Sequence, residues 1–369
     1  MHSIKIRNLK FKISLRSIDA FTLVELLITV AITVILTSVG FVMLNKYKGS
    51  QSIRLTLDQI SSAILDTRNK AISQLNGSPW GIRFTNSSAV QRYEVFEGLN
   101  YASGTSTAVY SLDKEVKFSN PFSSSTIDLA FSSVTGALSN SQVISIVDGS
   151  ADNLVGDFIL NTLGGITQRF ETGLVGYWHF DENASSTAYD ATGNVNNGTL
   201  KNSPTWQTGT NCKAGSCLSF NGTNNYIQLG TSQSYASALT VSAWVFHTSA
   251  SDWDDIVSGG CGNILFGFSN NVLNFGGQCN NPFTPISYST NINSAWHYVA
   301  GTYDGSAANL YVDGSLVASS TKSGVFSVFT PTIGGEGITE NFTGRIDEVR
   351  IYNRALSASE ILGQYNDLK

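Results

Sequence analysis

The clearest pattern in the chain lies in residues 296–314, which are WHYVAGTYDGSAANLYVDG. Apolar and polar side chains alternate over His297–Thr302 and again over Asn309–Val312, which is the period of a half-buried β-strand. Each run is followed by an Asp-Gly pair, at residues 304–305 and 313–314, and such pairs favour the tight turns of β-hairpins. The stretch therefore predicts consecutive antiparallel strands.

The same kind of pattern extends over residues 173–369, a length that suits one large β-sandwich. Short alternating runs recur at Ala214–Phe220, Tyr226–Leu229, Leu239–Val245 and Gly344–Ile351. The last segment, Ser357–Tyr365, is predicted to be a helix, because a serine followed three residues later by glutamate is the pattern of a capping box.

Composition and charge limit the possible functions of the 369 residues. Only 13% of the residues are charged, against about 25% in an ordinary globular protein, and the net charge is −5. An acidic chain of this kind is not expected to bind nucleic acid. The first 20 residues are the exception, because they contain five bases and one acid.

An apolar segment follows this basic leader. Residues 21–44 contain one charged side chain, Glu25, and a helix of this length would be about 36 Å long, enough to cross a bilayer. Helical spacing of apolar residues continues from Ile53 to Leu75, and Asn76-Gly77 is expected to end the helix. The bases before the segment predict a single-pass protein of the inner (cytoplasmic) membrane whose N-terminus is cytoplasmic.

Residues 20–27, AFTLVELL, resemble the prepilin cleavage and N-methylation motif of type IV pilins and type II secretion pseudopilins. The resemblance implies a leader at 1–20, cleavage between Ala20 and Phe21 by a prepilin peptidase, and methylation of the Phe21 amine. It also implies a pilin helix over 21–76, in which Glu25 neutralises the Phe21 amine of a neighbouring subunit during fibre assembly. Ala20 departs from the family, which usually has glycine there.

Residues 77–170 contain short β-type runs separated by Gly, Asn, Ser and Pro. Their order and spacing resemble the small β-sandwich head of minor pseudopilins of the GspH and FimT type. Residues 166–174 are the expected junction to the next domain. Because this junction has no Pro-rich or Ser-rich spacer, we expect the two domains to be joined closely.

Six segments of residues 173–369 resemble, in order, the LamG-like jelly roll of the concanavalin A-like class. They are GLVGYWHFDE (173–182), DATGNVNNGT (190–199), LSFNG (218–222), WHYVAGTYDG (296–305), LYVDG (310–314) and GRIDEVRIYNRALS (344–357). The expected fold class is thus α+β and all-β, with a long N-terminal helix, a small β-sandwich pilin head and a jelly-roll β-sandwich. The resemblance also implies that the last strand returns beside the first.

Oxygen-bearing side chains crowd residues 190–197, where a Gly-rich loop could direct carboxylate and amide oxygens toward Ca²⁺. The spacing alone fits an ordinary Asx-turn loop equally well. The resemblance favours a structural calcium ion and implies Asp190, Asn194, Asn196 and Asp347 as its ligands. The four histidines are scattered along the chain and are expected to pack rather than bind metal.

The four cysteines all lie after residue 211, which is typical of an exported, oxidised domain. A hairpin folded about Asn270, with a three-residue turn, would place Cys261 opposite Cys279 and Phe268 opposite Val272. Cys212 and Cys217 would close a small loop. Other pairings remain open at this stage.

The sequence contains a candidate residue for binding a sugar but no motif for cleaving one. Glycosidases of the concanavalin A-like fold carry E-x-D-x-x-E on one strand, and this sequence has no such pattern, so we expect no enzyme activity. Trp253 stands among polar residues and could stack on a sugar, although a buried position is an equal alternative. The acids Asp252, Asp254 and Asp255 around it are expected to form a solvated loop.

These features together predict a minor subunit of a type IV pilus or a type II secretion-like fibre, exposed at the cell surface. Its expected partners are other pilin or pseudopilin subunits, the prepilin peptidase, the inner membrane and a glycan or cell-surface ligand. The alternative is that the jelly roll is a structural spacer or a protein–protein contact module, or, as a third case, a glycan-active enzyme. The sequence does not distinguish a pilus from a secretion pseudopilus.

Overall fold

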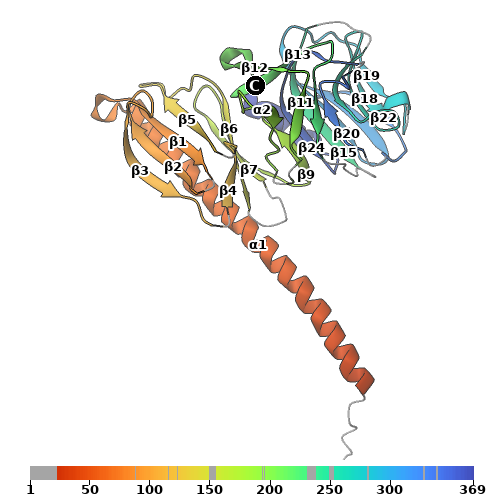
Figure 1. The fold of residues 1–369 in the computed structure, drawn as a ribbon, viewed down its shortest axis with the longest axis horizontal. Helices are drawn as coiled ribbons and strands as arrows, with labels where there is room; N and C mark the ends of the chain where they lie inside the picture. Colours follow the sequence, from red (N-terminus) through yellow and green to blue (C-terminus); the bar gives the residue numbers. More distant parts are fainter. Residues whose placement is uncertain are drawn as a thin grey trace, which may run out of the picture. The chain divides into compact units, whose positions relative to one another are not determined.

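The computed structural model describes residues 23–369 except 88, 115, 123, 149–154, 193, 195, 231–237, 249–252, 281, 327–328 and 338–339. The chain divides into two compact units, Met1–Tyr47 and Lys48–Lys369. Figure 1 shows the elements in sequence colours, and all β-strands belong to the second unit.

The first helix, α1, runs from Leu23 to Ile72 and is followed by the short 3-10 turn η1, Leu75–Gly77. One stripe of α1 is completely buried, because its apolar residues recur at helical spacing; it contains Ile53, Leu57, Ile60, Ile64 and Ala71. Leu75 was expected on this stripe, but its side chain is 44% exposed. The reason is that α1 ends at Ile72 and Gln74 has a left-handed backbone.

Eight strands after η1 form the head and make two antiparallel sheets of four strands each. The first sheet has the order β3-β2-β1-β5, with β1 Trp80–Asn86, β2 Gln91–Glu97, β3 Thr105–Ser111 and β5 Ser125–Phe131. The second has the order β4-β6-β7-β8, with β4 Val116–Asn120, β6 Gln142–Asp148, β7 Val155–Leu160 and β8 Ile166–Glu171. Both sheets contribute side chains to one core with the α1 stripe.

The junction between head and second domain is shorter than expected. Residues 166–171 are not a linker, because β8 pairs along its whole length with β7, from Ile166 opposite Leu160 to Glu171 opposite Val155. The next strand, β9, begins at Leu174. Thr172 and Gly173 are therefore the only residues between the two strands.

The second domain consists of two antiparallel sheets and a C-terminal helix. One sheet has the order β12-β13-β24-β15-β20-β21-β22, with β9 also paired to β24. Its strands are β9 Leu174–Trp178, β12 Thr205–Thr208, β13 Ser216–Asn221, β15 Leu239–His247, β20 Trp296–Tyr303, β21 Ala307–Val312, β22 Ser315–Thr321 and β24 Thr343–Tyr352. The last strand lies beside the first, as expected.

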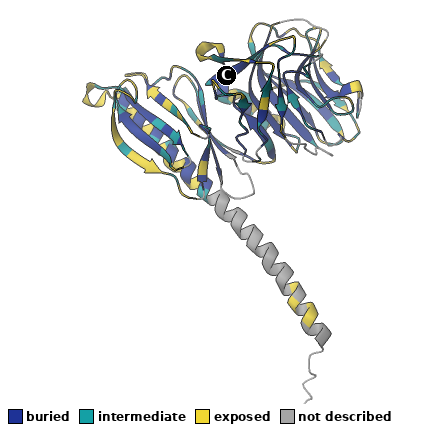
Figure 2. Cartoon of the chain, in the orientation of Figure 1, coloured by how far each residue is buried: buried dark blue, intermediate teal, exposed yellow. Residues whose placement is uncertain are grey.

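The other sheet has the order β10-β11-β14-β23-β16-β17-β18-β19. Its strands are β10 Thr187–Ala188, β11 Gly198–Lys201, β14 Tyr226–Leu229, β16 Asp254–Ser258, β17 Ile264–Ser269, β18 Val272–Gly277, β19 Ile286–Tyr288 and β23 Thr332–Ile333. Two short 3-10 turns, η2 Gly209–Asn211 and η3 Gln278–Asn280, interrupt the loops of this domain. A large apolar core draws on both sheets, and Figure 2 shows it as the buried interior of the domain.

The C-terminal helix α2, Ala358–Leu368, begins with the predicted capping box. Ser357 Oγ accepts a hydrogen bond from the Glu360 amide, and the Glu360 carboxylate accepts one from the Ser357 amide at 2.8 Å. The helix belongs to a third apolar core that also contains Val143, Val147 and Ile159 of the head. The head and the jelly roll thus share buried side chains, which confirms the close junction.

The β17–β18 hairpin corrects one predicted register. Ser269 pairs with Val272 and Phe268 with Leu273, so the turn has two residues rather than three. Asn270 and Asn271 both have positive φ, 49° and 67°, as a type I′ turn requires, and asparagine tolerates this backbone better than most residues. The expected pairing of Phe268 with Val272 is therefore wrong by one residue.

Candidate functional site

Trp253, the predicted ligand-binding residue, lines a pocket of about 380 Å³ that lies against strands β17, β18 and β19. The residues that line it come from β17, β18, β19, η3 and three loops. They are Trp253, Leu265, Asn274, Gly277, Gln278, Cys279, Thr284, Pro285, Ser287 and Glu340.

Trp253 is 37% exposed and lines this pocket immediately before β16 begins. The alternative of a buried tryptophan is thereby removed. Trp178, Trp244 and Trp296 lie within strand motifs and were expected in the core; Trp178 and Trp244 are buried, at 0% and 1% exposure, as is Trp80 at 4%, whereas Trp296 is only half-buried. A partly exposed indole beside a cavity offers a flat apolar surface to a ligand.

Polar side chains in the pocket are held in place by their neighbours. Asn274 donates a hydrogen bond to the Val272 carbonyl and accepts one from Ser287 Oγ, both at 2.7 Å. Gln278 donates to Glu340 at 2.5 Å and accepts from Ser258 Oγ at 2.9 Å. The pocket therefore combines one aromatic surface with amide, hydroxyl and carboxylate groups of fixed orientation.

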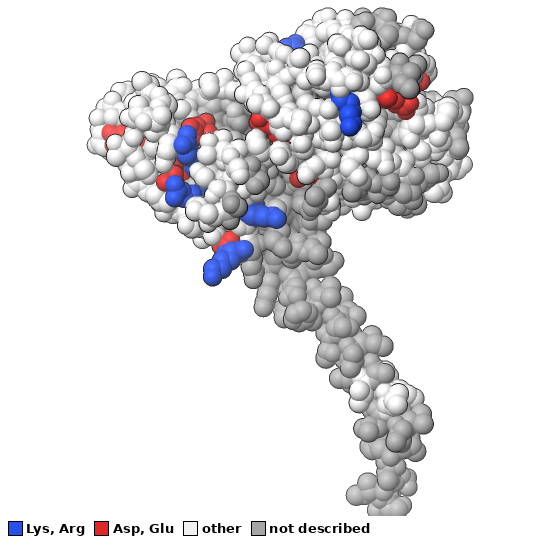
Figure 3. Space-filling model, viewed as in Figure 1, with Lys and Arg blue, Asp and Glu red and all other residues white. Residues whose placement is uncertain are grey.

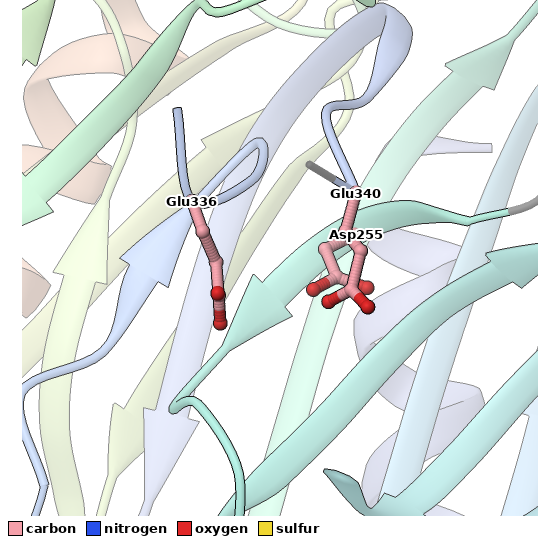
Figure 4. A group of neighbouring side chains, drawn as sticks. All are labelled: Asp255, Glu336 and Glu340. Atoms are coloured by element: carbon pink, nitrogen blue, oxygen red, sulfur yellow. The ribbon is translucent and has the colours of Figure 1, made fainter. Parts of the chain in front are cut away.

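Three carboxylates lie close together beside the pocket, and one of them, Glu340, also lines the pocket. The side chains of Asp255, Glu336 and Glu340 place their ligand oxygens within 4.8 Å of one another. Figure 4 shows Asp255 and Glu340 next to each other and Glu336 to one side of them; Glu336 and Glu340 both belong to the segment between β23 and β24. Burial and the nearby Glu340 carboxylate raise the pKa of Asp255 well above its ordinary value, and burial also raises the pKa of Glu340.

The sequence did not predict this acidic cluster. Asp254 and Asp255 were expected in a solvated loop, but they begin β16 and both are completely buried. Asp254 lies 2.7 Å from His247 Nε2, while Asp255 turns toward Glu336 and Glu340. Asp252 lies outside the described residues.

The Asp190 carboxylate is held by hydrogen bonds within a turn. It accepts hydrogen bonds from the amides of Tyr177, Thr192 and Asn196 at 2.9–3.1 Å and from Thr192 Oγ1 at 2.8 Å. Four donors occupy about the four lone-pair positions of a carboxylate. These contacts favour the alternative of a turn built around Asp190, and the calcium assignment there stays a prediction.

The other implied calcium ligands have contacts of their own. Asp347 accepts hydrogen bonds from the amides of Lys213 and Ala214, at 2.9 and 3.0 Å, and these are not partners of Asp190. Asn194 donates to the Val175 carbonyl at 3.1 Å. Asn196 is buried, and its backbone N–H donates a hydrogen bond to the Asp190 carboxylate.

The four cysteines form two disulfides, Cys212–Cys217 and Cys261–Cys279. These are the two pairings that the hairpin and the short spacing favoured. The other possible pairings of the four cysteines do not occur in the structure. Cys279 also lines the pocket, so the second disulfide connects the pocket to the residues that follow β16.

The predicted processing residues lie outside the part of the chain that can be examined. Ala20 and Phe21 are outside the described residues, and so is the side chain of Glu25. Most side chains of the expected membrane segment, 21–44, are also outside them. Within the described part of the chain, no helix combines the length and the hydropathy that a membrane crossing requires.

Comparisons with known proteins concern the second domain. Residues 221–362 match a family model described as the concanavalin A-like lectin/glucanases superfamily, a laminin G type. Pappalysin-1 of Homo sapiens is 36% identical over 74 residues, which are 18% of this chain and 4% of that protein.

Two similar solved structures cover about half of this chain. One is the receptor binding domain of botulinum neurotoxin C/D mosaic serotype, with 16% identity and a TM-score of 0.44 over 53% of this chain and 51% of that one. The other is domain 4 of AbnA, an extracellular arabinanase from Geobacillus stearothermophilus in complex with arabinotriose, with 22% identity and a TM-score of 0.42 over 54% of this chain and all of that one. The chain thus spans about half of the first structure and a small part of Pappalysin-1. The family match and the two facing sheets identify the second domain as a LamG-like jelly roll of the concanavalin A-like class.

Proposed function

We propose that the jelly-roll domain is a lectin-like module that binds a glycan in the pocket beside Trp253. The observation that carries this proposal is the 37% exposed indole at a 380 Å³ pocket that also contains the oriented amides of Asn274 and Gln278. A sugar ring has an apolar C–H face that can lie on an aromatic ring, and hydroxyl groups that exchange hydrogen bonds with amides and carboxylates. This pocket offers both kinds of contact.

The charge distribution fits an uncharged ligand. Figure 3 shows that the visible described surface is largely uncharged, with isolated basic and acidic side chains. Only 13% of the residues are charged. Binding would therefore depend on shape and hydrogen bonds, and we expect it to change little with salt concentration.

Binding of the full chain to a glycan array tests the proposal. We expect a defined set of glycans to be retained, and Trp253→Ala to weaken their affinity by more than about tenfold, as for an aromatic residue that dominates a binding site. Tyr110→Ala is the matched control, because Tyr110 is a 44% exposed aromatic on β3 of the head. Equal binding by the Trp253 variant, or no glycan bound by the wild type, would contradict this role and favour the spacer or protein-contact function.

The proposed role is binding without catalysis. The chain has no E-x-D-x-x-E strand pattern of the glycosidases that share this fold class. Incubation of the full chain with each retained glycan is expected to leave that glycan intact by mass spectrometry. A cleaved product that accumulates with time would contradict the proposal.

We also propose that the chain is a minor subunit of a type IV pilus or type II secretion-like fibre, which would display the jelly roll outside the cell. The observation that supports this second function is the sequence AFTLVELL at residues 20–27. Mass spectrometry of the mature protein tests it, because the N-terminus should be a methylated Phe21. Glu25→Gln should abolish incorporation into fibres, while Asp58→Asn, at an exposed site of α1, should not. A mature protein that begins at Met1 would contradict it.

A further inference from the structure

We propose that Asp255, Glu336 and Glu340 form a binding site for a divalent oxygen-preferring cation, with Ca²⁺ as the best fit. The three residues come from β16 and from the segment between β23 and β24, so folding alone brings them together. This site is distinct from the Asp190 loop and does not depend on the proposed glycan function.

Asp255 is the observation that points to a ligand. Its side chain is completely buried, and neither carboxylate oxygen accepts a hydrogen bond from the described residues. Ser258 has one hydroxyl proton, and its close contacts are with Glu336 at 2.7 Å and Gln278 at 2.9 Å. A buried carboxylate without donors is costly, so it requires either a proton or a positive charge beside it.

Protein cations do not supply that charge. Among the described residues, no salt bridge joins Asp255, Glu336 or Glu340 to a lysine, arginine or histidine. Three carboxylates this close repel one another, and a bound divalent cation would convert the repulsion into attraction. Their mutual distance is therefore explained by an ion at their centre.

The spacing and the donor atoms indicate the type of cation. The cluster offers carboxylate oxygens and no thiolate or imidazole, which favours Ca²⁺, Mg²⁺ or Mn²⁺ over Zn²⁺. Two oxygens on opposite sides of Ca²⁺ are about 4.6–5.2 Å apart, and around Mg²⁺ about 4.0–4.2 Å. The ligand oxygens lie within 4.8 Å of one another, which both ions allow. Ca²⁺ is the better fit because it accepts flexible carboxylate coordination, whereas Mg²⁺ requires near-ideal octahedral geometry and usually retains several waters.

The backbone holds the three side chains in this arrangement. The Asp255 amide donates to the Glu340 carbonyl at 2.9 Å, so β16 is fixed against the loop that carries Glu340. Next to Glu336, Gly335 has a φ of +122°, and a Cβ there would lie 2.7 Å from the Asn341 Cα. Asn341 in turn accepts from the Gly337 amide at 2.9 Å. Glycine at 335 thus allows the loop to direct Glu336 toward Asp255.

Calorimetric titration of the chelator-treated full chain with CaCl₂ alone tests the site. We expect one ion per chain and a rise in melting temperature with Ca²⁺ that EDTA reverses. Asp255→Asn should weaken calcium binding by more than about tenfold and remove the thermal shift. Glu336→Gln is the second ligand variant, and Asp58→Asn, at an exposed acid of α1, is the control that should behave as the wild type.

Folding defects can be separated from loss of the ion. In EDTA, Asp255→Asn should be at least as stable as the wild type, because it removes a buried charge, and only in Ca²⁺ should the wild type become the more stable protein. Asp190→Asn should keep the calcium response; loss of the response in that variant alone would place the ion in the 190–197 loop and overturn the proposal. Absence of a thermal shift in the wild type, or a shift with Mg²⁺ but none with Ca²⁺, would also overturn it.

Discussion

Ser145 Oγ, on β6 of the head, lies 2.8 Å from His179 Nε2 of the jelly-roll domain. The same hydroxyl donates its proton to Asp157 at 2.6 Å, so His179 Nε2 must donate to Ser145. The other ring nitrogen, Nδ1, lies 2.9 Å from the Glu348 carboxylate and donates to it. With Asp157 ionised, these contacts favour the protonated form of His179. Burial lowers the His179 pKa, but the Glu348 carboxylate raises it by more, so the pKa lies above its ordinary value.

Replacement of Ser145 by alanine should destabilise the whole of the second unit. The variant leaves Asp157 and His179, both buried, without the hydroxyl that joins them, and such a loss costs about 1–3 kcal/mol. Urea denaturation measures the change in the free energy of unfolding. Ser111→Ala, at an exposed position of β3, is the control and should change stability by less than about 0.5 kcal/mol. Equal stability of the two variants would contradict the role of the buried network.

The head and the jelly roll should unfold together. Ile159 of β7 is 2% exposed and belongs to the core that also contains Trp244 and the α2 residue Ile361. Ile159→Ala should therefore cost about 2–5 kcal/mol and lower a single melting transition of both domains. Differential scanning calorimetry checks this. Two separate transitions, of which the variant lowers only one, would show that the shared core does not couple the domains.

Local patterns in the sequence predicted much of this architecture. Alternation and Asp-Gly turns predicted β20 and β21, the spacing of Ser357 and Glu360 predicted the start of α2, and a hairpin predicted that Cys261 faces Cys279. Each of these features depends on residues close together in the chain, where propensity and turn chemistry act directly.

Features that depend on distant residues were missed. The acidic cluster joins Asp255 to residues about 80 positions later, and only the pairing of β16 with β23 and the adjacent loop brings them together. Asp255 looked solvated because two other acids, Asp252 and Asp254, come just before it. The hairpin register was wrong by one residue because the choice between two-residue and three-residue turns rests on the backbone of Asn270 and Asn271.

Glu182 should make the protein less stable as the pH rises. Burial raises its pKa to about 8, although it accepts a hydrogen bond from the Tyr189 amide, and its Oε2 has no partner among the described residues. Between pH 4.5 and 8 the folded state then holds a proton that the unfolded state has released. The free energy of unfolding therefore falls as the pH rises through this range. Below pH 4.5 Glu182 is protonated in both the folded and the unfolded state, so its contribution to stability no longer changes with pH.

Glu182→Gln isolates this effect from other titrating groups. The amide keeps the acceptor for Tyr189 and cannot ionise, so the variant should gain stability relative to the wild type from pH 6 to pH 8. Denaturation curves at five pH values give the difference directly. Glu360→Gln is the opposite control, because Arg354 lowers the Glu360 pKa to about 2 and that variant should lose stability equally at pH 6 and pH 8. A parallel pH profile for Glu182→Gln and the wild type would contradict the raised pKa.

The Cys261–Cys279 disulfide should be the main covalent support of the pocket. Both cysteines are exposed, so replacement of the pair by serine removes the cross-link without leaving a buried cavity. A closed loop of 18 residues restricts the unfolded chain by about 3 kcal/mol in the loop-entropy treatment, and this is the expected loss of stability. Because Cys279 and Gln278 line the pocket, ligand affinity should fall as well.

Reductant provides the internal control for this last comparison. In excess dithiothreitol neither the wild type nor the Cys261→Ser/Cys279→Ser variant has a cross-link, and both contain Cys212 and Cys217 as thiols, so the two proteins differ only in the side chains at 261 and 279. Their free energies of unfolding should then converge. If the difference of about 3 kcal/mol persists under reducing conditions, the serine side chains themselves, and not the missing bond, are responsible for the loss.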